Sequence, residues 1–345
     1  MTISEAPRPA ASTAIPHDYS KKAMVFGGRS SMDLASKIAG KLGLDLGEVT
    51  LKTFSDGEVY CRYEETIRGA DVFLVQSTCA NEAEGMTPND ALMELLVMAD
   101  AAQGASAHRI IAVMPWYGYA RQDKKSAPRE PVTARIVAKT LEAVGVDRVL
   151  TMDLHAGQVQ GFFHIPVDHM TAMPLLTQWF TDQDFGDEEL VIVSPDAGRV
   201  KVARNFARKV GTHWAVMEKE RPAQQVAEIG YVVGDVKGKT AVLTDDMIDT
   251  AGTLTAAAKT VLDEGAARVI SCATHAVFSG PAYERLTYEN SGIERIVVTD
   301  TIPLRPGAPD NITVLPTAGI LADSIRRIFT DDSVSEIFAG ENQLF

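Results

Sequence analysis

The sequence has little cysteine, no long apolar run and no excess of basic charge. Its three cysteines, Cys61, Cys79 and Cys272, stand far apart with no CxxC pair, which argues against a zinc knuckle or a disulfide framework and favours a reducing cytoplasm. No apolar run reaches the ~18 residues that span a membrane, and the first residues lack a basic region followed by an apolar core, so neither a membrane partner nor a secretory signal is expected. The net charge of -13 argues against a general nucleic-acid binder.

Two common nucleotide-binding motifs are also missing. No GxGxxG follows a predicted strand. The segment "GDVKGKT" at 234–240 resembles a P-loop, but it is one residue short and is followed by a strand pattern, whereas a P-loop opens into a helix. We interpret it as a connection between two strands. The single histidines show no metal-binding spacing.

What the sequence does contain is a regular alternation of strand and helix patterns, which predicts an α/β fold. At roughly one domain per 150 residues, 345 residues favour two domains. The segments 24–43 and 191–211 both read as strand, small-residue turn and basic helix ending in glycine, which suggests two similar domains, each a mainly parallel sheet flanked by helices. The predicted divisions are a flexible tail at 1–20, an N-terminal domain at 21–168, a C-terminal domain at 169–326, and a segment at 327–345 that packs on the N-terminal domain.

The stretch "VLTDDMIDTAGTL" at 242–254 combines features that suit different chemical groups. Asp245 and Asp246 end a buried-type strand, where ligands sit in open α/β sheets. The segment Thr250–Thr253 then opens a helix, whose backbone N–H groups and macrodipole favour an anion. The carboxylates, including Asp249, suit sugar hydroxyls or Mg²⁺. A phosphorylated ribose satisfies both halves of the stretch.

This stretch resembles the phosphoribosyl diphosphate (PRPP) loop of proteins with the type I phosphoribosyltransferase fold. Other motifs resemble ribose-phosphate diphosphokinases (PRPP synthetases), most closely the phosphate- and ADP-regulated class I enzymes, from about Met24 to about Phe338. These motifs are "TFSDGEVY", "MELLVMADAAQGASAHRI", "PWYGYARQDKK", "REPVTAR", "MDLHAGQVQGFF", "VSPDAG" and "THAVFSGPA". The resemblance implies transfer of the β,γ-diphosphoryl group of ATP to the anomeric hydroxyl of ribose 5-phosphate, leaving AMP.

The resemblance also implies a sugar site and an ATP site. The sugar site is Asp245, Asp246, Asp249, Thr250, Ala251, Gly252 and Thr253, with the last four on the 5-phosphate, Asp245 and Asp249 on ribose hydroxyls, and Asp246 assisting with charge or metal. The ATP site is Phe54, Asp56, Gly57, Glu58, Arg121 and Gln122. By itself "FSDGE" predicts a hairpin turn; in the family this hairpin reaches a neighbouring subunit's nucleotide.

The catalytic and metal residues are likewise implied by the resemblance. Lys219 and Arg221 match the family's catalytic pair, and Glu220 between them departs from the basic residue of many relatives. His155 and Asp196 match the Mg²⁺ ligands, although imidazole is an unusual ligand for a metal that prefers oxygen. Asp153 and His155 are expected two apart on a strand, and so on one face.

Regulation and assembly follow only from the family. Ser333 and Ser335 match a segment that helps form an allosteric phosphate and ADP site, and a homohexamer is implied. Two alternatives stay open: a base phosphoribosyltransferase, which the PRPP loop fits equally well, and a non-catalytic regulatory homologue.

Overall fold

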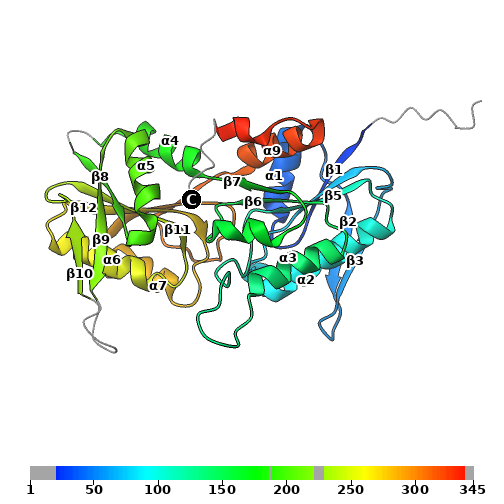
Figure 1. Ribbon diagram of the computed structural model, residues 1–345, viewed down its shortest axis with the longest axis horizontal. Helices are drawn as coiled ribbons and strands as arrows, with labels where there is room; N and C mark the ends of the chain where they lie inside the picture. The colour runs from blue at the N-terminus through cyan, green and yellow to red at the C-terminus, as the bar shows by residue number, and fades with distance from the viewer. Residues whose placement is uncertain (1–20, 186–187, 221–228, 339–345) are drawn as a thin grey trace, which may run out of the picture.

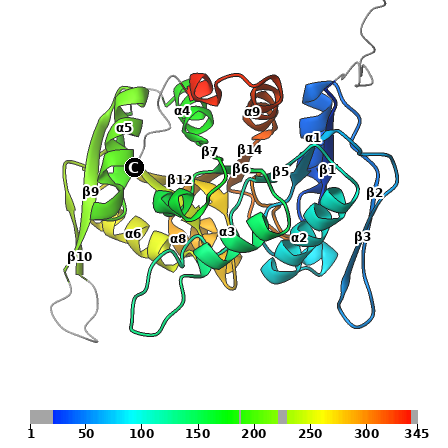
Figure 2. The same ribbon diagram turned by 45° about the vertical axis from the view of Figure 1, so that its right-hand side comes forward.

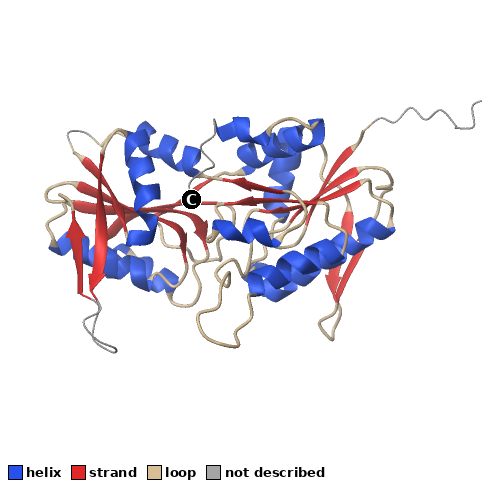
Figure 3. Ribbon diagram, in the orientation of Figure 1, coloured by secondary structure: helices blue, strands red, loops and turns tan. Residues whose placement is uncertain are grey.

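A computed structural model describes residues 21–185, 188–220 and 229–338, which form two α/β halves placed end to end (Figure 1). Each half is a mainly parallel sheet with helices on both faces (Figure 3), which confirms the predicted fold class. The predicted tail at 1–20 lies outside the described residues.

The first sheet has the strand order β1-β4-β5-β6-β7, and all neighbouring strands are parallel. Its strands are β1 (Ala23–Gly27), β4 (Asp71–Val75), β5 (Arg109–Met114), β6 (Arg148–Met152) and β7 (Val167–Met170). Every residue of β4 is buried, as expected for a parallel strand that is covered on both faces.

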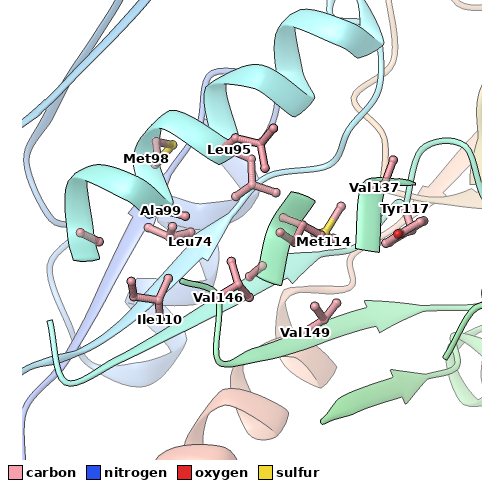
Figure 4. Close-up of a cluster of buried hydrophobic side chains, with 14 of the residues drawn as sticks. Leu74, Leu95, Met98, Ala99, Ile110, Met114, Tyr117, Val137, Val146 and Val149 are labelled. Carbon is pink, nitrogen blue, oxygen red and sulfur yellow. The ribbon is translucent and has the colours of Figure 1, made fainter. Parts of the chain in front are cut away.

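Four helices cover this sheet. On one face lie α2 (Pro88–Gly104) and α3 (Thr133–Ala143), whose side chains pack with Leu74, Met114 and Val149 of the sheet (Figure 4). On the other lie α1 (Met32–Leu42) and α9 (Ala318–Thr330), the latter from the far end of the chain. Helix α2 begins with a capping box between Thr87 and Asp90, which satisfies free N–H groups at its start.

The strands β2 (Val49–Thr53) and β3 (Val59–Tyr63) form a separate antiparallel hairpin, as predicted. Gly57 in its turn has a φ of 98°, a conformation that favours glycine. The hairpin extends away from the body of the first half (Figures 1 and 2).

The second sheet has the order β10-β9-β8-β11-β12-β13-β14, in which only β10 runs antiparallel to its neighbour. Its strands are β8 (Leu190–Ser194), β9 (His213–Glu220), β10 (Ile229–Val233), β11 (Thr240–Ile248), β12 (Arg268–Ala276), β13 (Ile293–Thr299) and β14 (Ile312–Leu315). The segment 234–240 connects β10 to the start of β11, so the interpretation of "GDVKGKT" as a strand connection is confirmed.

The helices of the second half again lie on both faces of the sheet. The face formed partly by Val193 and Leu243 packs against α6 (Gly252–Asp263) and α7 (Ala282–Leu286), beside which lies α8 (Tyr288–Ser291). The opposite face packs against α4 (Met173–Asp182) and α5 (Val200–Val210). The division at residues 168 and 326 stays a prediction; these positions fall inside β7 and α9.

The two sheets meet at the carboxyl ends of their central strands. Ser77, just after β4, donates from Oγ to the Thr301 carbonyl oxygen at 2.5 Å. His275 near the end of β12 contacts the Met152 carbonyl oxygen at the end of β6, at 3.1 Å from Nε2. Residues that follow the strands of both halves are therefore brought into one region, where α/β proteins bind ligands.

Candidate active site

The predicted PRPP stretch covers the second half of β11, which includes Asp245 and Asp246 and continues to Ile248, and it leads into α6. Ala251, directly before the helix, has a φ of 62°, so the chain turns through a left-handed residue to bring the helix start beside the strand end. The loop lines a cavity of about 330 Å³, together with Arg121 and His155 from the first half. The free N–H groups at the start of α6 favour an anion in this position.

Asp246 is the most enclosed carboxylate of the loop, with a side chain that is only 3% exposed. Its Oδ1 lies 2.6 Å from Arg199 Nη2, and its Oδ2 lies 2.7 Å from His155 Nδ1. Burial opposes its ionisation, but the hydrogen bond with His155 and the charge of Arg199 outweigh burial and hold the pKa of Asp246 below its ordinary value. Asp246 therefore joins residues of both halves as an anion.

Asp245 beside it is in a different state. It accepts the Asp246 backbone N–H at 2.8 Å and lies 3.7 Å from Arg199. Burial raises the pKa of Asp245 well above its ordinary value, and the neighbouring Asp246 carboxylate adds to the rise. In this pair, Asp245 thus favours the protonated form and Asp246 favours the ionised form.

Asp249, the third carboxylate, faces the first half. Arg121 Nη1 lies 2.5 Å from its Oδ2, and the Ser279 hydroxyl donates to its Oδ1. Arg121 and Asp249 both line the cavity with the loop. The structure therefore brings a predicted ATP residue and a predicted ribose residue into direct contact.

The two predicted metal residues, His155 and Asp196, line the same cavity. Asp196 Oδ1 accepts the backbone N–H groups of Gly198 and Arg199, at 2.9 and 3.1 Å. Within the described residues no three His, Cys, Asp or Glu side chains gather so that they could hold a metal by themselves. The donors suit an ion that takes few protein ligands and keeps water or phosphate for the rest, as Mg²⁺ does.

The expectation that Asp153 and His155 share a strand face is wrong. Strand β6 ends at Met152, and Asp153 has a φ of 36°, so the alternation of a strand does not continue past Met152. The Asp153 carboxylate contacts the Ala172 N–H and the Thr274 hydroxyl, whereas His155 contacts Asp246.

The predicted ATP residues fall in two places. Arg121 and Gln122 line a second cavity of about 710 Å³ between the halves, which also includes Trp116, Phe278 and Arg305. The others are Phe54, Asp56, Gly57 and Glu58, all exposed on the β2–β3 hairpin. None of these four lines either cavity, so within one chain the hairpin is not brought to the loop.

The predicted catalytic pair lies at the edge of what the structure describes. Lys219 is in β9, with its backbone opposite Gly230 of β10. Arg221 lies outside the described residues, as do the side chains of Lys219 and Glu220.

The predicted regulatory residues lie after α9. The Ser333 carbonyl oxygen accepts a hydrogen bond from Arg327 Nη1 at 2.6 Å. Ser335 lies in a short 3-10 helix, Val334–Phe338, and both serines are exposed.

Three site residues were missed by the sequence analysis. Arg199 pairs with Asp246, Ser279 donates to Asp249, and Arg285 Nη1 donates to the Thr250 carbonyl oxygen at 3.0 Å. Arg199 directly follows the "SPDAG" motif, so its place after a strand end was an available signal. Ser279 lies in the "THAVFSGPA" motif, three residues after the end of β12, which was a comparable signal, whereas Arg285 reaches the loop only through tertiary packing.

Among the described residues, the structure has no helix of the length and apolarity required to cross a membrane.

Comparisons with known proteins agree with this architecture. Residues 23–145 match the N-terminal domain of ribose phosphate pyrophosphokinase, and residues 226–339 match the phosphoribosyl synthetase-associated domain. The ribose-phosphate pyrophosphokinase of Caldanaerobacter subterraneus subsp. tengcongensis is 50% identical over 321 residues, covering 93% of this chain and 99% of the relative. That of Clostridium perfringens is 49% identical over 323 residues, with the same coverage of 93% and 99%.

A crystal structure of phosphoribosylpyrophosphate synthetase from Mycobacterium smegmatis superimposes with a TM-score of 0.83 at 43% identity, covering 90% of this chain and 100% of that one. The likeness thus extends over both halves and over the loop between β11 and α6. The chain belongs to the ribose-phosphate pyrophosphokinase family of enzymes.

Proposed function

We propose that this chain transfers the β,γ-diphosphoryl group of ATP to the anomeric hydroxyl of ribose 5-phosphate, giving PRPP and AMP. The bond that forms joins the anomeric oxygen to the β-phosphorus, and the bond that breaks joins this phosphorus to the oxygen that leaves with AMP. The single observation that carries the proposal is the cavity at Asp249–Thr253, where carboxylates and a helix start of one half face Arg121 of the other.

The sugar site is proposed at the loop. The start of α6 would hold the 5-phosphate through backbone N–H groups and the hydroxyls of Thr250 and Thr253, which are exposed to the cavity. Asp245 and Asp249 would accept ribose hydroxyls. Asp246 is proposed to hold the two halves of the site together, because its carboxylate contacts both Arg199 and His155.

The nucleotide is proposed beside Arg121 and Gln122. The cavity of about 710 Å³ that both residues line is within the size range of ligand sites. Phe54, Asp56, Gly57 and Glu58 are exposed on the β2–β3 hairpin and do not line this cavity. They are therefore proposed to reach the nucleotide of another subunit, and the homohexamer is proposed from the resemblance alone.

Mg²⁺ is proposed at His155 and Asp196, with phosphate oxygens and water as its remaining ligands. Mg²⁺ would neutralise charge on the phosphate oxygens. Lys219 and Arg221 are proposed to stabilise the charge of the diphosphoryl group in transfer, Arg221 in a bidentate manner. Regulation at Ser333 and Ser335 and a cytoplasmic location remain proposals from the resemblance and the composition.

Product analysis tests the proposed reaction. The pure protein is incubated with Mg²⁺, ATP and ribose 5-phosphate, and nucleotides and PRPP are separated by ion-exchange chromatography. AMP and PRPP are expected in equal amounts, and ribose without the 5-phosphate should give neither. ADP as the main product, or consumption of added PRPP with a nucleobase, would reject the proposal.

A further inference from the structure

The chain leaves β6 through Asp153, whose φ of 36° lies in the region that residues other than glycine seldom adopt. Such a conformation persists only where surrounding contacts enforce it, and it often marks a functional position. The contacts of Asp153 identify what enforces it here.

Both sides of the molecule hold this residue. A single carboxylate oxygen, Oδ2, accepts the Ala172 N–H at 2.8 Å and the Thr274 hydroxyl at 2.6 Å. The Asp153 carbonyl oxygen lies 3.1 Å from His275 Nε2. Because a carbonyl oxygen can only accept, Nε2 carries the proton. Asp153 is thus bound by two residues of β12 in the second sheet and by the segment after β7 in the first.

The next two residues, Leu154 and His155, are also held by contacts with other segments of the chain. Leu154 is buried and its N–H donates to His169 Nε2 at 2.8 Å. His155 follows, with a side chain that is 40% exposed and with Nδ1 2.7 Å from Asp246 Oδ2. His155 is therefore the point at which the fixed backbone reaches the cavity.

We propose that Asp153 is a positioning residue for His155. Its carboxylate joins the end of β6 to Thr274 of the other half, and the resulting turn sets the imidazole against Asp246. The importance of His155 for turnover rests on the proposed function, whereas the joining of the two halves does not. Because both donors use one oxygen, the required property is a hydrogen-bond acceptor and not a negative charge.

This distinction gives two matched pairs of variants. Asp153→Ala removes the acceptor, while Asp153→Asn keeps an oxygen that can serve both donors. Thr274→Val removes the hydroxyl at nearly constant volume, while Thr274→Ser keeps it. Ser77→Ala is the control, because it also deletes one buried hydroxyl between the halves, one whose partners are the Thr301 carbonyl oxygen and the Trp116 N–H and not Asp153 or His155.

Two measurements are made on the full-length protein. Hydrogen exchange of the peptide 150–156 should accelerate in Asp153→Ala and Thr274→Val. In the other three variants its rate should stay near that of the unsubstituted protein. The kcat for PRPP formation should fall roughly 10- to 100-fold in Asp153→Ala, the scale of a small misplacement in an active site. The KM for ribose 5-phosphate should change less than about threefold, since the phosphate loop is untouched.

The outcomes separate the inference from the proposed function. If the original protein makes no PRPP, the proposed function fails, and the exchange pattern alone still decides whether Asp153 joins the halves. If Asp153→Asn is as damaged as Asp153→Ala, the charge matters and the positioning role is overturned. It is also overturned if Ser77→Ala lowers kcat as much as Thr274→Val, because the effect would then be general to the interface.

Discussion

Arg121 of the first half and Asp249 of the second form an ion pair, with Nη1 2.5 Å from Oδ2. The first residue is proposed for the nucleotide and the second for the ribose. While they bind each other, Nη1 and Oδ2 are occupied, although the other N–H groups of Arg121 and further lone pairs of Asp249 can still bind a ligand. A ligand that uses Nη1 or Oδ2 must therefore displace this contact.

Arg121→Met should tighten binding of ribose 5-phosphate in the absence of nucleotide. The pair is partly exposed, and such pairs contribute about 0.2–1 kcal/mol, so the Kd should fall by a factor of roughly 1.4 to 5. Isothermal titration calorimetry measures this directly, with Arg121→Lys as the control that keeps the charge. Weaker binding in Arg121→Met would mean that Arg121 itself contacts the sugar phosphate.

Asp246→Ala should destabilise the protein strongly. The change leaves Arg199, which is 18% exposed, without its closest carboxylate, and breaking a buried pair in this way costs about 3–5 kcal/mol. Urea denaturation gives the free energy of unfolding. The neighbouring Asp245→Asn at neutral pH serves as the control, and a loss in Asp246→Ala no greater than in this control would contradict the structural role of Asp246.

Asp245 should make stability fall as the pH rises. Its folded-state pKa is raised from 3.8 to about 8, so its contribution is fully present below pH 3.8 and is lost as the pH approaches 8. Relative to Asp245→Asn, the original protein should therefore lose stability between pH 5 and pH 8. The measurement is urea denaturation of both proteins at a series of pH values without Mg²⁺; parallel curves would show that Asp245 does not titrate in this range.

Lys219→Ala should lower kcat by roughly 10²- to 10³-fold, the loss typical of removing one group that stabilises a transition state. Glu220→Gln, at the next position in the chain, should leave kcat nearly unchanged. Initial-rate kinetics test both, and size-exclusion chromatography checks that assembly is unaltered. Near-normal turnover in Lys219→Ala would exclude this lysine from the mechanism.

Phe54→Ala should raise the KM for ATP without affecting the stability of one chain. Phe54 is 44% exposed, with Lys52 Nζ 5.1 Å from its ring centroid, so its removal costs little within the hairpin. If the hairpin completes a neighbour's nucleotide site, activity should also fall on dilution below the assembly concentration. An unchanged KM for ATP would show that Phe54 of the hairpin does not contribute to nucleotide binding.

The elements with local signals were predictable from the sequence. The β2–β3 hairpin is specified by alternation around Asp56–Gly57, and the PRPP loop by a buried strand, paired acids and small residues before a helix. Asp153 shows the limit of such reasoning, because alternation assumes that a strand continues. Its left-handed φ is enforced by Thr274 and Ala172, which are distant in sequence.

The contacts across the cavity could not be predicted for the same reason. Arg199 with Asp246, Arg121 with Asp249 and Ser279 with Asp249 each depend on how loops of separate strands are brought together. The sequence identified residue types that suit a ligand, but not which of them pair with each other before the ligand arrives.

Helix α9, near the end of the chain, covers the face of the first sheet that also carries α1. During synthesis on a ribosome, Leu321 and Ile325 of α9 emerge only after the whole second half. Val25, Phe73 and Ile111 on that face of the sheet therefore lack these packing partners until synthesis is nearly complete. Until then α1 covers only its own part of this face, and such delayed long-range contacts expose apolar residues to aggregation. Loss of the last helix by premature termination should thus harm the half of the protein that was made first.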